Sequence, residues 1–534
     1  MIKRIKNLKI IEWIAVGLFL IFFTRLTIVG FVEVGDTNDS GWYYGVAQLL
    51  AEEGIYGSRL NTAISNETIT TSIHDRPMVQ TKEGYELFPS GVTVGPGFII
   101  PQAIIFKILG VNQFSRTIFP FIVYVVLVLV ILKLILILTT IKGVVLFELM
   151  LLINPRLSIP LAFQAYSEPL GMMYLLLGLL LILKIFSREI ETIKRRELMI
   201  AGLLLGLSFE TKMLYFIGVI IVLTYVALEL RKKGKGLLLQ KLILLFAGVF
   251  LPFIVFELYR FVVLYQIGEL SAWIKNSEAI IDVFMNMGSG VYRSTLFPST
   301  SELINKIDSF RGVNVLVVLL IPILFLVFKI FPRFSDMQKK VFVLLVTLML
   351  GYCSWFVFLN TTGWFRHLWP GVFILLIILS VVISQVKYSG LFLIGLFIPG
   401  LLLTGNYKEL TWNINTIINR YGEDFNVNWV RQLPMPIIPQ TEQSEFIDII
   451  NSLPKNENLY FERGFFVGEL LSQTDRKMWP LAKDNHFPKY LVIGSAQQGP
   501  YALIPKDDID NVKKELCPRV LMDSTYYSLC IIPQ

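Results

Sequence analysis

Acidic and basic side chains stand at the ends of long apolar runs, where they are candidates for function because charges are costly near a bilayer interior. The set is Asp36, Asp39, Glu168, Lys212, Arg366 and His367. A carboxylate can take a proton from an acceptor hydroxyl. Lys and Arg side chains can stabilise the charge that develops on a departing phosphate. If the fold brings these side chains together, they suit a reaction on a phosphorylated lipid.

The apolar runs that carry these residues predict an α-helical polytopic membrane protein. Of the 534 residues, 54% are hydrophobic and 16% are charged, whereas a soluble domain carries about 25% charged residues. A bilayer accepts this apolar surface in helices that satisfy their own backbone, and about eleven runs are long enough or nearly so. We expect spans at residues 10–34, 115–138, 143–162, 169–186, 198–211, 213–230, 237–262, 312–331, 341–360, 367–385 and 389–405.

Basic residues between the runs predict the orientation of the chain. They precede the first run at Lys3–Lys9 and fill the loops Arg188–Arg196, Arg231–Lys235 and Lys329–Lys340. All fall on one side of the predicted map, which the positive-inside rule makes the cytoplasmic side. We therefore expect a multi-pass protein of the cell membrane with a cytoplasmic N-terminus. The net charge of +8 then reflects topology and not nucleic-acid binding.

Composition divides the chain into two predicted domains, a transmembrane domain at 1–405 and a small extracytoplasmic α/β domain at 406–534. In the first outer loop, 35–114, we expect a helix at Gly41–Glu53. The segment Pro96–Gly110 is apolar but too short to span, which favours an interfacial or re-entrant helix. The C-terminal domain is expected to contain helices at Thr441–Leu453 and Asp507–Leu516 and strands at Asn458–Glu462, Tyr490–Gly494, Arg519–Met522 and Tyr526–Ile532.

The chain contains three cysteines and three dispersed histidines, with no spacing typical of a metal site. Cys353 lies inside a predicted span and is expected to be a small core residue. Cys517 and Cys530 flank a predicted hairpin, where an outer compartment permits a disulfide. Two reduced, buried thiols are the alternative. No cofactor is indicated.

The motif Asp39-Ser-Gly-Trp-Tyr43-Tyr-Gly-Val-Ala47, followed by Gly54-Ile-Tyr56, resembles the first outer loop of GT-C glycosyltransferases. It is similar above all to family 39, which includes protein O-mannosyltransferases and aminoarabinose transferases. Further matches follow in order at Phe88-Pro-Ser-Gly…Gly95-Pro96, Phe106-Lys-Ile-Leu-Gly110, Arg116, Asn154-Pro155…Ser167-Glu168-Pro169, Ala201-Gly-Leu-Leu-Leu-Gly206…Thr211-Lys212 and Arg366-His367…Pro370. The resemblance covers residues 1–405.

This resemblance implies an inverting transfer of a sugar from a polyprenyl-phosphate donor to a lipid, glycan or protein acceptor on the outer face. It implies that Asp39 is the general base. The family often has Glu after this Asp, and Ser40 stands there instead, which leaves Asp36 as a helper or as the base itself. Related oligosaccharide transferases use a divalent metal, which this sequence does not indicate.

The remaining site residues take their expected roles from the same resemblance. Lys212 and Arg366 match positions for the donor phosphate, and Glu168 matches an acid that orients a sugar or acceptor. His367 and Tyr43 complete the expected substrate-binding set.

Other interpretations of these residues stay open. Asp36 and Asp39 could cap the helix near Gly41, and Tyr43 could be an interfacial aromatic. Arg366 and His367 could be interfacial anchors, and Lys212 could snorkel. A transporter or flippase of lipid-linked sugars is an alternative function, with intramembrane charges at Glu148, Glu257 and Arg260. A polymerase or ligase that uses a diphosphate-linked donor and a non-catalytic assembly protein are further alternatives.

Overall fold

The structure is a computed structural model. It describes residues 9–32, 38–58, 69–71, 77–80, 86–87, 95–153, 157–188, 194–232, 235–266, 268, 270–271, 273–274, 327, 330–359, 365–386, 440–454, 459–462, 478–483, 490–492, 501–505, 519–523 and 527–531. Its α-helices are α2 Ile10–Val32, α3 Asn38–Glu53, α4 Pro96–Leu109, α5 Gln113–Leu138, α6 Ile141–Ile153, α7 Ile159–Phe163, α8 Glu168–Phe186, α9 Arg195–Thr211, α10 Phe216–Lys232, α11 Lys235–Gln266, α15 Asp336–Ser354, α16 Phe365–Ser384 and α19 Gln440–Ser452. Short 3-10 helices cover Met213–Tyr215 (η3) and Phe331–Arg333 (η5), and a π-helix covers Trp355–Leu359.

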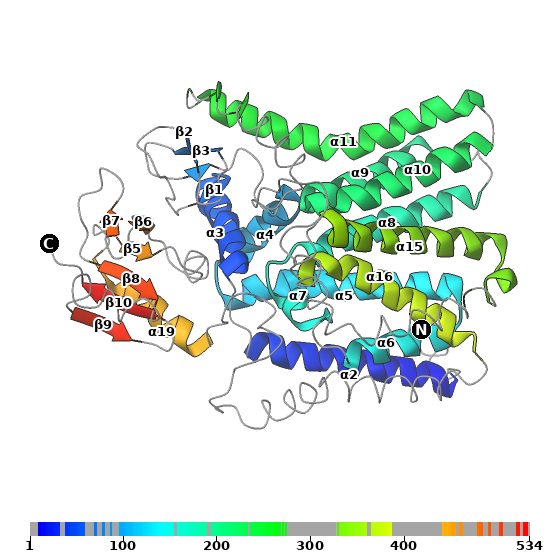
Figure 1. The fold of residues 1–534 in the computed structure, drawn as a ribbon, viewed down its shortest axis with the longest axis horizontal. Helices are drawn as coiled ribbons and strands as arrows, with labels where there is room; N and C mark the ends of the chain where they lie inside the picture. The colour runs from blue at the N-terminus through cyan, green and yellow to red at the C-terminus, as the bar shows by residue number, and fades with distance from the viewer. Residues whose placement is uncertain are drawn as a thin grey trace.

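The long helices lie side by side in one bundle, with α3 and α4 at one end and strands of the C-terminal segment beyond them (Figure 1). Within the described ranges, seven helices are long and apolar enough to cross a membrane. They start at residues 10, 114, 168, 213, 240, 336 and 366. Each coincides with a predicted span, so the chain is a mostly helical membrane protein. The predicted span at 389–405, and all but the end of the one at 312–331, lie outside the described residues.

Two predicted spans differ from the helices that form. The run 143–162 is not one helix, because α6 ends at Ile153 and the short α7 begins at Ile159. The sequence supplies the reason, since Pro155 disfavours helical geometry in the residue before it. The predicted span at 198–211 corresponds to α9, which begins three residues earlier, at Arg195. Its 17 residues give it a length of about 26 Å at about 1.5 Å per residue.

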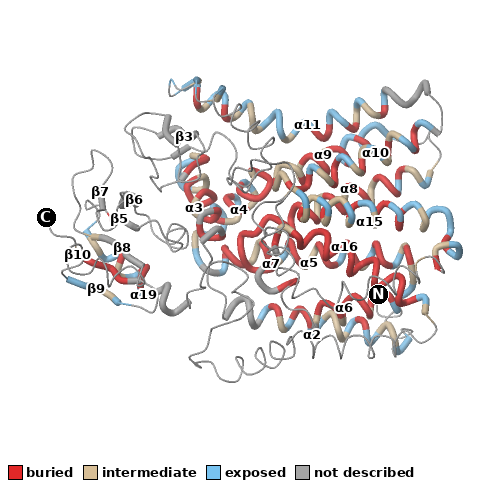
Figure 2. Tube along the Cα trace, in the orientation of Figure 1, coloured by how far each residue is buried: buried red, intermediate tan, exposed pale blue. Residues whose placement is uncertain are grey.

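Burial divides the helices into a packed interior and an apolar rim (Figure 2). Helix α16 is central, with 94% of its spanning window buried, whereas α2 and α11 are each 22% buried. The exposed side chains of α11 include Phe250, Ile254, Leu258 and Val262. Large apolar side chains exposed along a membrane-spanning helix are the surface that lipid covers. Helices α2 and α11 therefore form part of the lipid-facing rim.

Glycines allow α9 and α11 to pack closely. A Cβ added to Gly202 would lie 2.2 Å from the carbonyl oxygen of Leu245, and one added to Gly206 would lie 2.2 Å from that of Val249. Likewise, a Cβ added to Gly248 on α11 would clash with the carbonyl oxygen of Met199 on α9. Such spacing of small residues lets helix backbones approach in a membrane. This contact fixes the end of α9 relative to α11.

The described part of the C-terminal segment contains the helix α19 and a sheet. Six strands pair in the order β7-β6-β5-β8-β10-β9. Their bounds are β5 Leu459–Glu462, β6 Met478–Lys483, β7 Tyr490–Val492, β8 Tyr501–Pro505, β9 Arg519–Asp523 and β10 Tyr527–Ile531. Strand β5 runs parallel to both neighbours, and the other pairs are antiparallel. The strands predicted at 458–462, 490–494, 519–522 and 526–532 are confirmed, as is the helix at 441–453, whereas the helix predicted at 507–516 lies outside the described residues.

The two parts of the chain differ in the bonding state of their cysteines. Cys530 is buried in β10 and disulfide-bonded, and Cys353 is a free cysteine in α15. The predicted partner, Cys517, lies outside the described residues. A disulfide is typical of an oxidising compartment.

The first loop contains a small sheet that sequence analysis did not predict. Strands β1 Gly57–Ser58, β4 Glu86–Leu87, β3 Pro77–Gln80 and β2 Ile69–Thr71 pair antiparallel in that order. They follow α3, and the next residue after that helix, Gly54, has φ 75°, a left-handed conformation that glycine adopts without strain. Helix α4 is the short apolar helix predicted at 96–110, and it packs against α3, α5 and α9.

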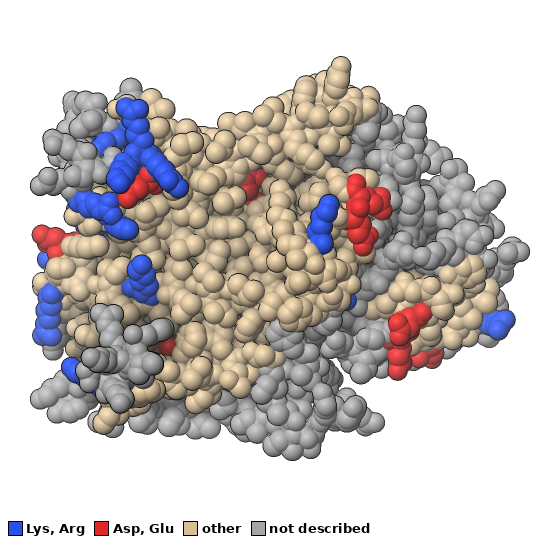
Figure 3. Space-filling view, turned by 180° about the vertical axis from the view of Figure 1, so that it is seen from behind, with Lys and Arg blue, Asp and Glu red and all other residues tan. Residues whose placement is uncertain are grey.

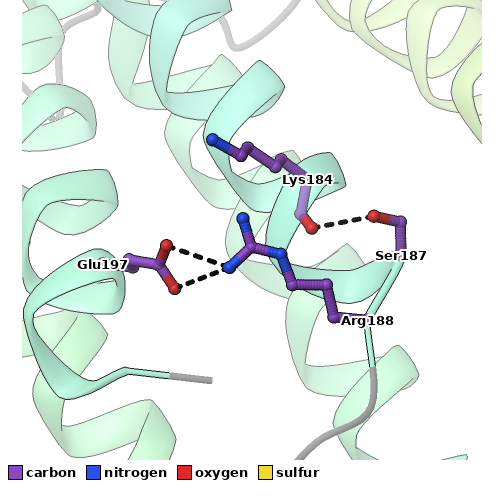
Figure 4. Close-up of polar contacts among 4 residues, drawn as sticks. All are labelled: Lys184, Ser187, Arg188 and Glu197. Carbon is purple, nitrogen blue, oxygen red and sulfur yellow. Dashed lines mark hydrogen bonds and ion pairs between the residues drawn. The ribbon is translucent and has the colours of Figure 1, made fainter. Parts of the chain in front are cut away.

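The opposite end of the bundle is basic. Figure 3 shows Lys and Arg side chains gathered at the end away from the C-terminal strands. There α8 ends and α9 begins, and Arg188 Nη1 donates to both carboxylate oxygens of Glu197 at 3.1 and 3.4 Å, beside Lys184 and Ser187 (Figure 4). Lys340 Nζ likewise pairs with Glu229 Oε2 at 2.6 Å and joins α15 to α10. We call this the basic end, and the end that carries α3 and α4 the site end.

Candidate active site

A buried ion pair forms the centre of the site end. Glu168 begins α8 and is 0% exposed, and its Oε1 accepts a hydrogen bond from Lys212 Nζ. Lys212 is the residue between α9 and η3, where the chain turns at the end of a helix. The second oxygen of Glu168, Oε2, has no hydrogen-bond partner among the described residues. The pair therefore offers an ammonium group and one carboxylate oxygen with capacity to accept.

Packing around a glycine holds this pair in place. The Tyr215 hydroxyl donates to the backbone carbonyl of Glu168. Its ring lies where a Cβ on Gly171 would be, only 2.2 Å from the nearest ring carbon. Ser208 Oγ donates to the carbonyl of Gly171 at 2.7 Å. The first turn of α8 is thus fastened to the end of α9 and to η3, so Glu168 and Lys212 are positioned by three elements.

Helix α3 is joined to the segment that leads into Glu168. The backbone N–H of Ala165 donates to Ser40 Oγ at 2.7 Å, and Ser40 is buried. The Tyr44 hydroxyl, one turn further along α3, donates to the carbonyl of Arg116 at 2.7 Å. Asp39 directly precedes Ser40 within the first turn of α3. The backbone of Asp39 is therefore beside the segment that leads into Glu168, while Asp36 lies outside the described residues.

The start of α16 completes the arrangement. Arg366 is 7% exposed, and its guanidinium lies over the Tyr166 ring, 5.4 Å from the centroid, within the range of a cation–π contact. His367 meets Trp355 edge to face at 5.9 Å between centroids. His367 also lies close enough to Lys212 and Arg366 to interact with both charges. Arg366, His367, Lys212 and Glu168 thus share one region.

Helix α4 closes against the end of α9. The N–H of Gly95 donates to the carbonyl of Thr211 at 3.1 Å. A Cβ on Gly97 would lie 2.8 Å from the backbone nitrogen of Thr211. Only glycine allows this approach, which explains the Gly-Pro-Gly sequence at 95–97 in physical terms. The contact supports Lys212, the next residue along the chain.

The structure brings four of the candidates together, Glu168, Lys212, Arg366 and His367, and their roles stay predictions. Helix α3 begins at Asn38, three residues before the predicted start, so Asp39 lies inside the helix and not at a capping position. Tyr43 is 3% exposed and packs in a small core cluster with Phe98, Ala165 and Leu170.

Sequence analysis missed Ser40, Tyr166 and Tyr215, which bind or support the charged groups. The feature of the sequence that could have pointed to them is that each lies within a few residues of Asp39, Glu168 or Lys212. A polar or aromatic residue beside a candidate is too common a pattern to be singled out from one sequence.

Within the described ranges, no group of three or more His, Cys, Asp or Glu residues could hold a metal ion. The cation that Glu168 faces is the ammonium of Lys212.

The site combines positive charge with restricted access to water. Lys212 and Arg366 can bind and stabilise a phosphate, and burial strengthens such contacts because the effective dielectric constant is low. Glu168 Oε2 can accept a hydrogen bond from a hydroxyl. The arrangement therefore suits cleavage of a bond to a phosphate at the end of a membrane bundle.

Comparison with solved structures identifies the architecture. ArnT from Cupriavidus metallidurans, in its crystal structure bound to undecaprenyl phosphate, matches with a TM-score of 0.59 at 12% sequence identity, over 98% of this chain and 100% of that one. The apo structure of ArnT matches with a TM-score of 0.58 over 97% of this chain. The chain has the GT-C fold.

A second GT-C neighbour comes from an archaeon. The oligosaccharyltransferase AglB from Archaeoglobus fulgidus, in complex with an inhibitory peptide and a dolichol-phosphate, matches with a TM-score of 0.50 at 10% identity, over 93% of this chain and 70% of that one. No protein-family model and no curated protein matches the sequence. The GT-C fold is thus shared with proteins that differ from this chain in nearly nine residues of ten.

Proposed function

We propose that this GT-C protein is an inverting glycosyltransferase. It transfers a sugar from a polyprenyl phosphate to an acceptor hydroxyl on the outer face of the cell membrane. The observation that carries the proposal is the buried Glu168–Lys212 pair, with Arg366 and His367 beside it. The first turn of α3 is hydrogen-bonded to the segment that leads into Glu168. The ArnT neighbour, which binds undecaprenyl phosphate, supports a lipid-phosphate donor.

The reaction assigns a role to each charge. The Asp39 carboxylate takes the proton of the acceptor hydroxyl, and the oxygen attacks the anomeric carbon opposite the phosphate. The bond between that carbon and the phosphate oxygen breaks, and its electron pair leaves with the phosphate. Lys212 and Arg366 stabilise the negative charge that develops there. One displacement of this kind inverts the configuration at the sugar carbon.

Glu168 has two tasks in this proposal. Its Oε1 holds the Lys212 ammonium, which keeps that charge at the donor phosphate. Its Oε2 has no partner among the described residues and accepts a hydrogen bond from a sugar hydroxyl. His367 adds a contact to the donor beside Arg366.

The first prediction concerns the base. We expect Asp39→Asn to lower turnover of a polyprenyl-phosphate sugar by about 10²–10⁴-fold, because the amide cannot take a proton. The measurement uses the full chain in nanodiscs with radiolabelled donors and includes slow hydrolysis to free sugar. Donor binding should persist in the variant. Glu53→Gln is the matched control, since it alters an exposed carboxylate at the far end of the same helix.

Other outcomes separate the alternatives. Activity retained in Asp39→Asn but lost in Asp36→Asn would make Asp36 the base. If the wild-type protein neither binds nor turns over any donor of the panel, the glycosyltransferase proposal fails. Transport of lipid-linked sugars would then be tested next.

A further inference from the structure

A second cluster of polar and aromatic side chains lies at the site end, on α11 and the elements packed against it. We call Tyr56, Glu210, Glu257, Arg260 and Trp273 the α11 cluster. Arg260 Nη2 donates to Glu257 Oε2, and Trp273 Nε1 donates to the same oxygen at 3.0 Å. The charges of Glu257 and Arg260 act on Glu210, and those of Glu210 and Arg260 act on Tyr56. The proposed reaction uses none of these residues.

The cluster adjoins the candidate active site. Glu210 lies two residues before Lys212, and its carbonyl oxygen is 1.8 Å from the place that a Cβ on Gly95 would occupy. Arg260 lies in the last two turns of α11, a helix of 32 residues. A helix of that length, about 48 Å, exceeds the hydrocarbon core of about 30 Å. The α11 cluster is therefore near the membrane surface, within reach of a second substrate.

Arg260 has donors that the described protein does not satisfy. Its side chain is 3% exposed, and both Nε and Nη1 are buried without a hydrogen-bond partner among the described residues. A buried, unsatisfied donor costs free energy, and more so on a charged group. The unmet requirement is for oxygen atoms that accept hydrogen bonds.

The net charge of the α11 cluster decides which kind of oxygen-bearing group suits Arg260. Glu257 already neutralises Arg260, and Glu210 adds a second carboxyl group nearby. Burial and then the charge of Glu210 raise the pKa of the Tyr56 hydroxyl above its ordinary value, so Tyr56 stays a neutral donor. A cluster without excess positive charge does not favour a further anion. Hydroxyl groups suit it, because each can both accept from Arg260 and donate to a carboxylate.

Aromatic rings surround these polar groups. The Tyr56 ring meets Phe256 at 4.9 Å between centroids, and Tyr259 stacks on Phe256 at 6.1 Å. Trp273 meets Phe261 edge to face at 5.8 Å. Rings supply apolar faces for C–H groups, while a few fixed polar atoms set orientation, which is the usual composition of a small-molecule site.

We propose that the α11 cluster is a subsite for a neutral sugar residue of the acceptor, so that the acceptor is a glycan. The inference rests on the proposed glycosyltransferase function. Arg260 donates to the ring or hydroxyl oxygens of that sugar, and Glu210 and Glu257 accept from its hydroxyls. Trp273 positions Glu257 through its N–H.

Saturation-transfer difference NMR tests the subsite without any donor. The full chain is placed in phosphatidylcholine nanodiscs, free of sugar-based detergent, with the methyl glycosides of glucose, galactose, mannose and N-acetylglucosamine. We expect transfer to at least one of them and a loss of at least tenfold in its affinity in Arg260→Gln. Trp273→Phe, which removes the N–H donor and one ring of the indole but keeps an aromatic side chain, should weaken binding less. Tyr265→Phe is the control on the same helix, since Tyr265 is 68% exposed.

Donor hydrolysis, measured in parallel, keeps the two proposals distinct. It should persist in Arg260→Gln and Trp273→Phe, because the proposed reaction does not use these residues. If no methyl glycoside binds, or if both variants bind like the wild type, the subsite proposal is overturned. Preferential binding of glucose 1-phosphate would overturn it too, in favour of an anion site. If Arg260→Gln does not fold, an unchanged affinity in Trp273→Phe and Glu257→Gln decides against the proposal.

Discussion

Glu168 and Lys212 place two opposite charges in a buried position. The Glu168 side chain is 0% exposed and that of Lys212 is 11% exposed. Desolvation of such a pair costs nearly as much as the attraction returns, so replacing both charges has little effect on stability. Removing one partner leaves an uncompensated charge, which costs about 3–5 kcal/mol. Stability and function of this pair can therefore be separated by experiment.

A double-mutant cycle makes that separation. We expect Lys212→Met to lower the free energy of unfolding by about 3–5 kcal/mol, because it leaves the Glu168 carboxylate buried alone. The variant with both Glu168→Gln and Lys212→Met should recover most of that stability. Its donor turnover should stay as low as that of Lys212→Met, because the donor phosphate still lacks the ammonium. Thermal unfolding and donor hydrolysis on the same preparations measure both effects. Recovery of turnover in the double variant would show that Lys212 has only a structural role.

The charged candidates of the site could be chosen from the sequence, whereas the contacts that hold them could not. Asp39, Glu168 and Lys212 could be found because a charge at the end of an apolar run is rare and therefore informative. The bond from Ala165 to Ser40 and the cation–π contact of Arg366 with Tyr166 join residues far apart in the chain. Such contacts depend on how helices are arranged in space, which periodicity does not encode.

At the scale of elements, the positions of α4, α9 and α11 depend on glycines at points of backbone contact. A Cβ added to Gly206 would clash with the carbonyl of Val249 and with Pro252 Cδ on α11. A Cβ added to Gly97 would clash with Thr211. The apolar runs predicted each of these elements, but not that α9 packs against both α8 and α11. The Gly-x-x-x-Gly spacing at 202–206 was visible in the sequence, although its partner helix was not.

A pair of alanine substitutions tests this contact. We expect Gly206→Ala to destabilise the protein by about 1–3 kcal/mol, because overpacking forces the helices apart. Gly17→Ala on α2 is the control, since a Cβ there meets nothing within 4 Å. Alanine is the better helix former by about 0.5–1 kcal/mol, so the control should be as stable as the wild type or more so. The measurement is the midpoint of thermal unfolding in nanodiscs. Equal midpoints for the two variants would contradict the close contact.

At the scale of the whole molecule, the bundle has two ends of different character. The basic end carries Lys and Arg at the ends of α8, α9, α10 and α15, and the site end carries the candidate active site. Seven spans could be predicted because continuous apolar runs determine helices in lipid. The break between α6 and α7 and the sheet of β1–β4 were missed. The break was missed because the span at 143–162 was inferred from apolar length alone. The sheet was missed because short strands in a polar loop lack clear alternation.

The orientation of this bundle decides where the proposed reaction takes place. Positive residues stay on the cytoplasmic side during insertion, so the site end should face outward, where the disulfide of Cys530 can persist. Single cysteines at Glu53 on the site end and Lys142 on the basic end, both exposed, report this in a Cys353→Ala background. In intact cells a membrane-impermeant maleimide should label Glu53→Cys, and it should label Lys142→Cys only after permeabilisation. The reverse pattern would place the site in the cytoplasm, where the transfer would use acceptors of that compartment and the proposed outer-face reaction would fail.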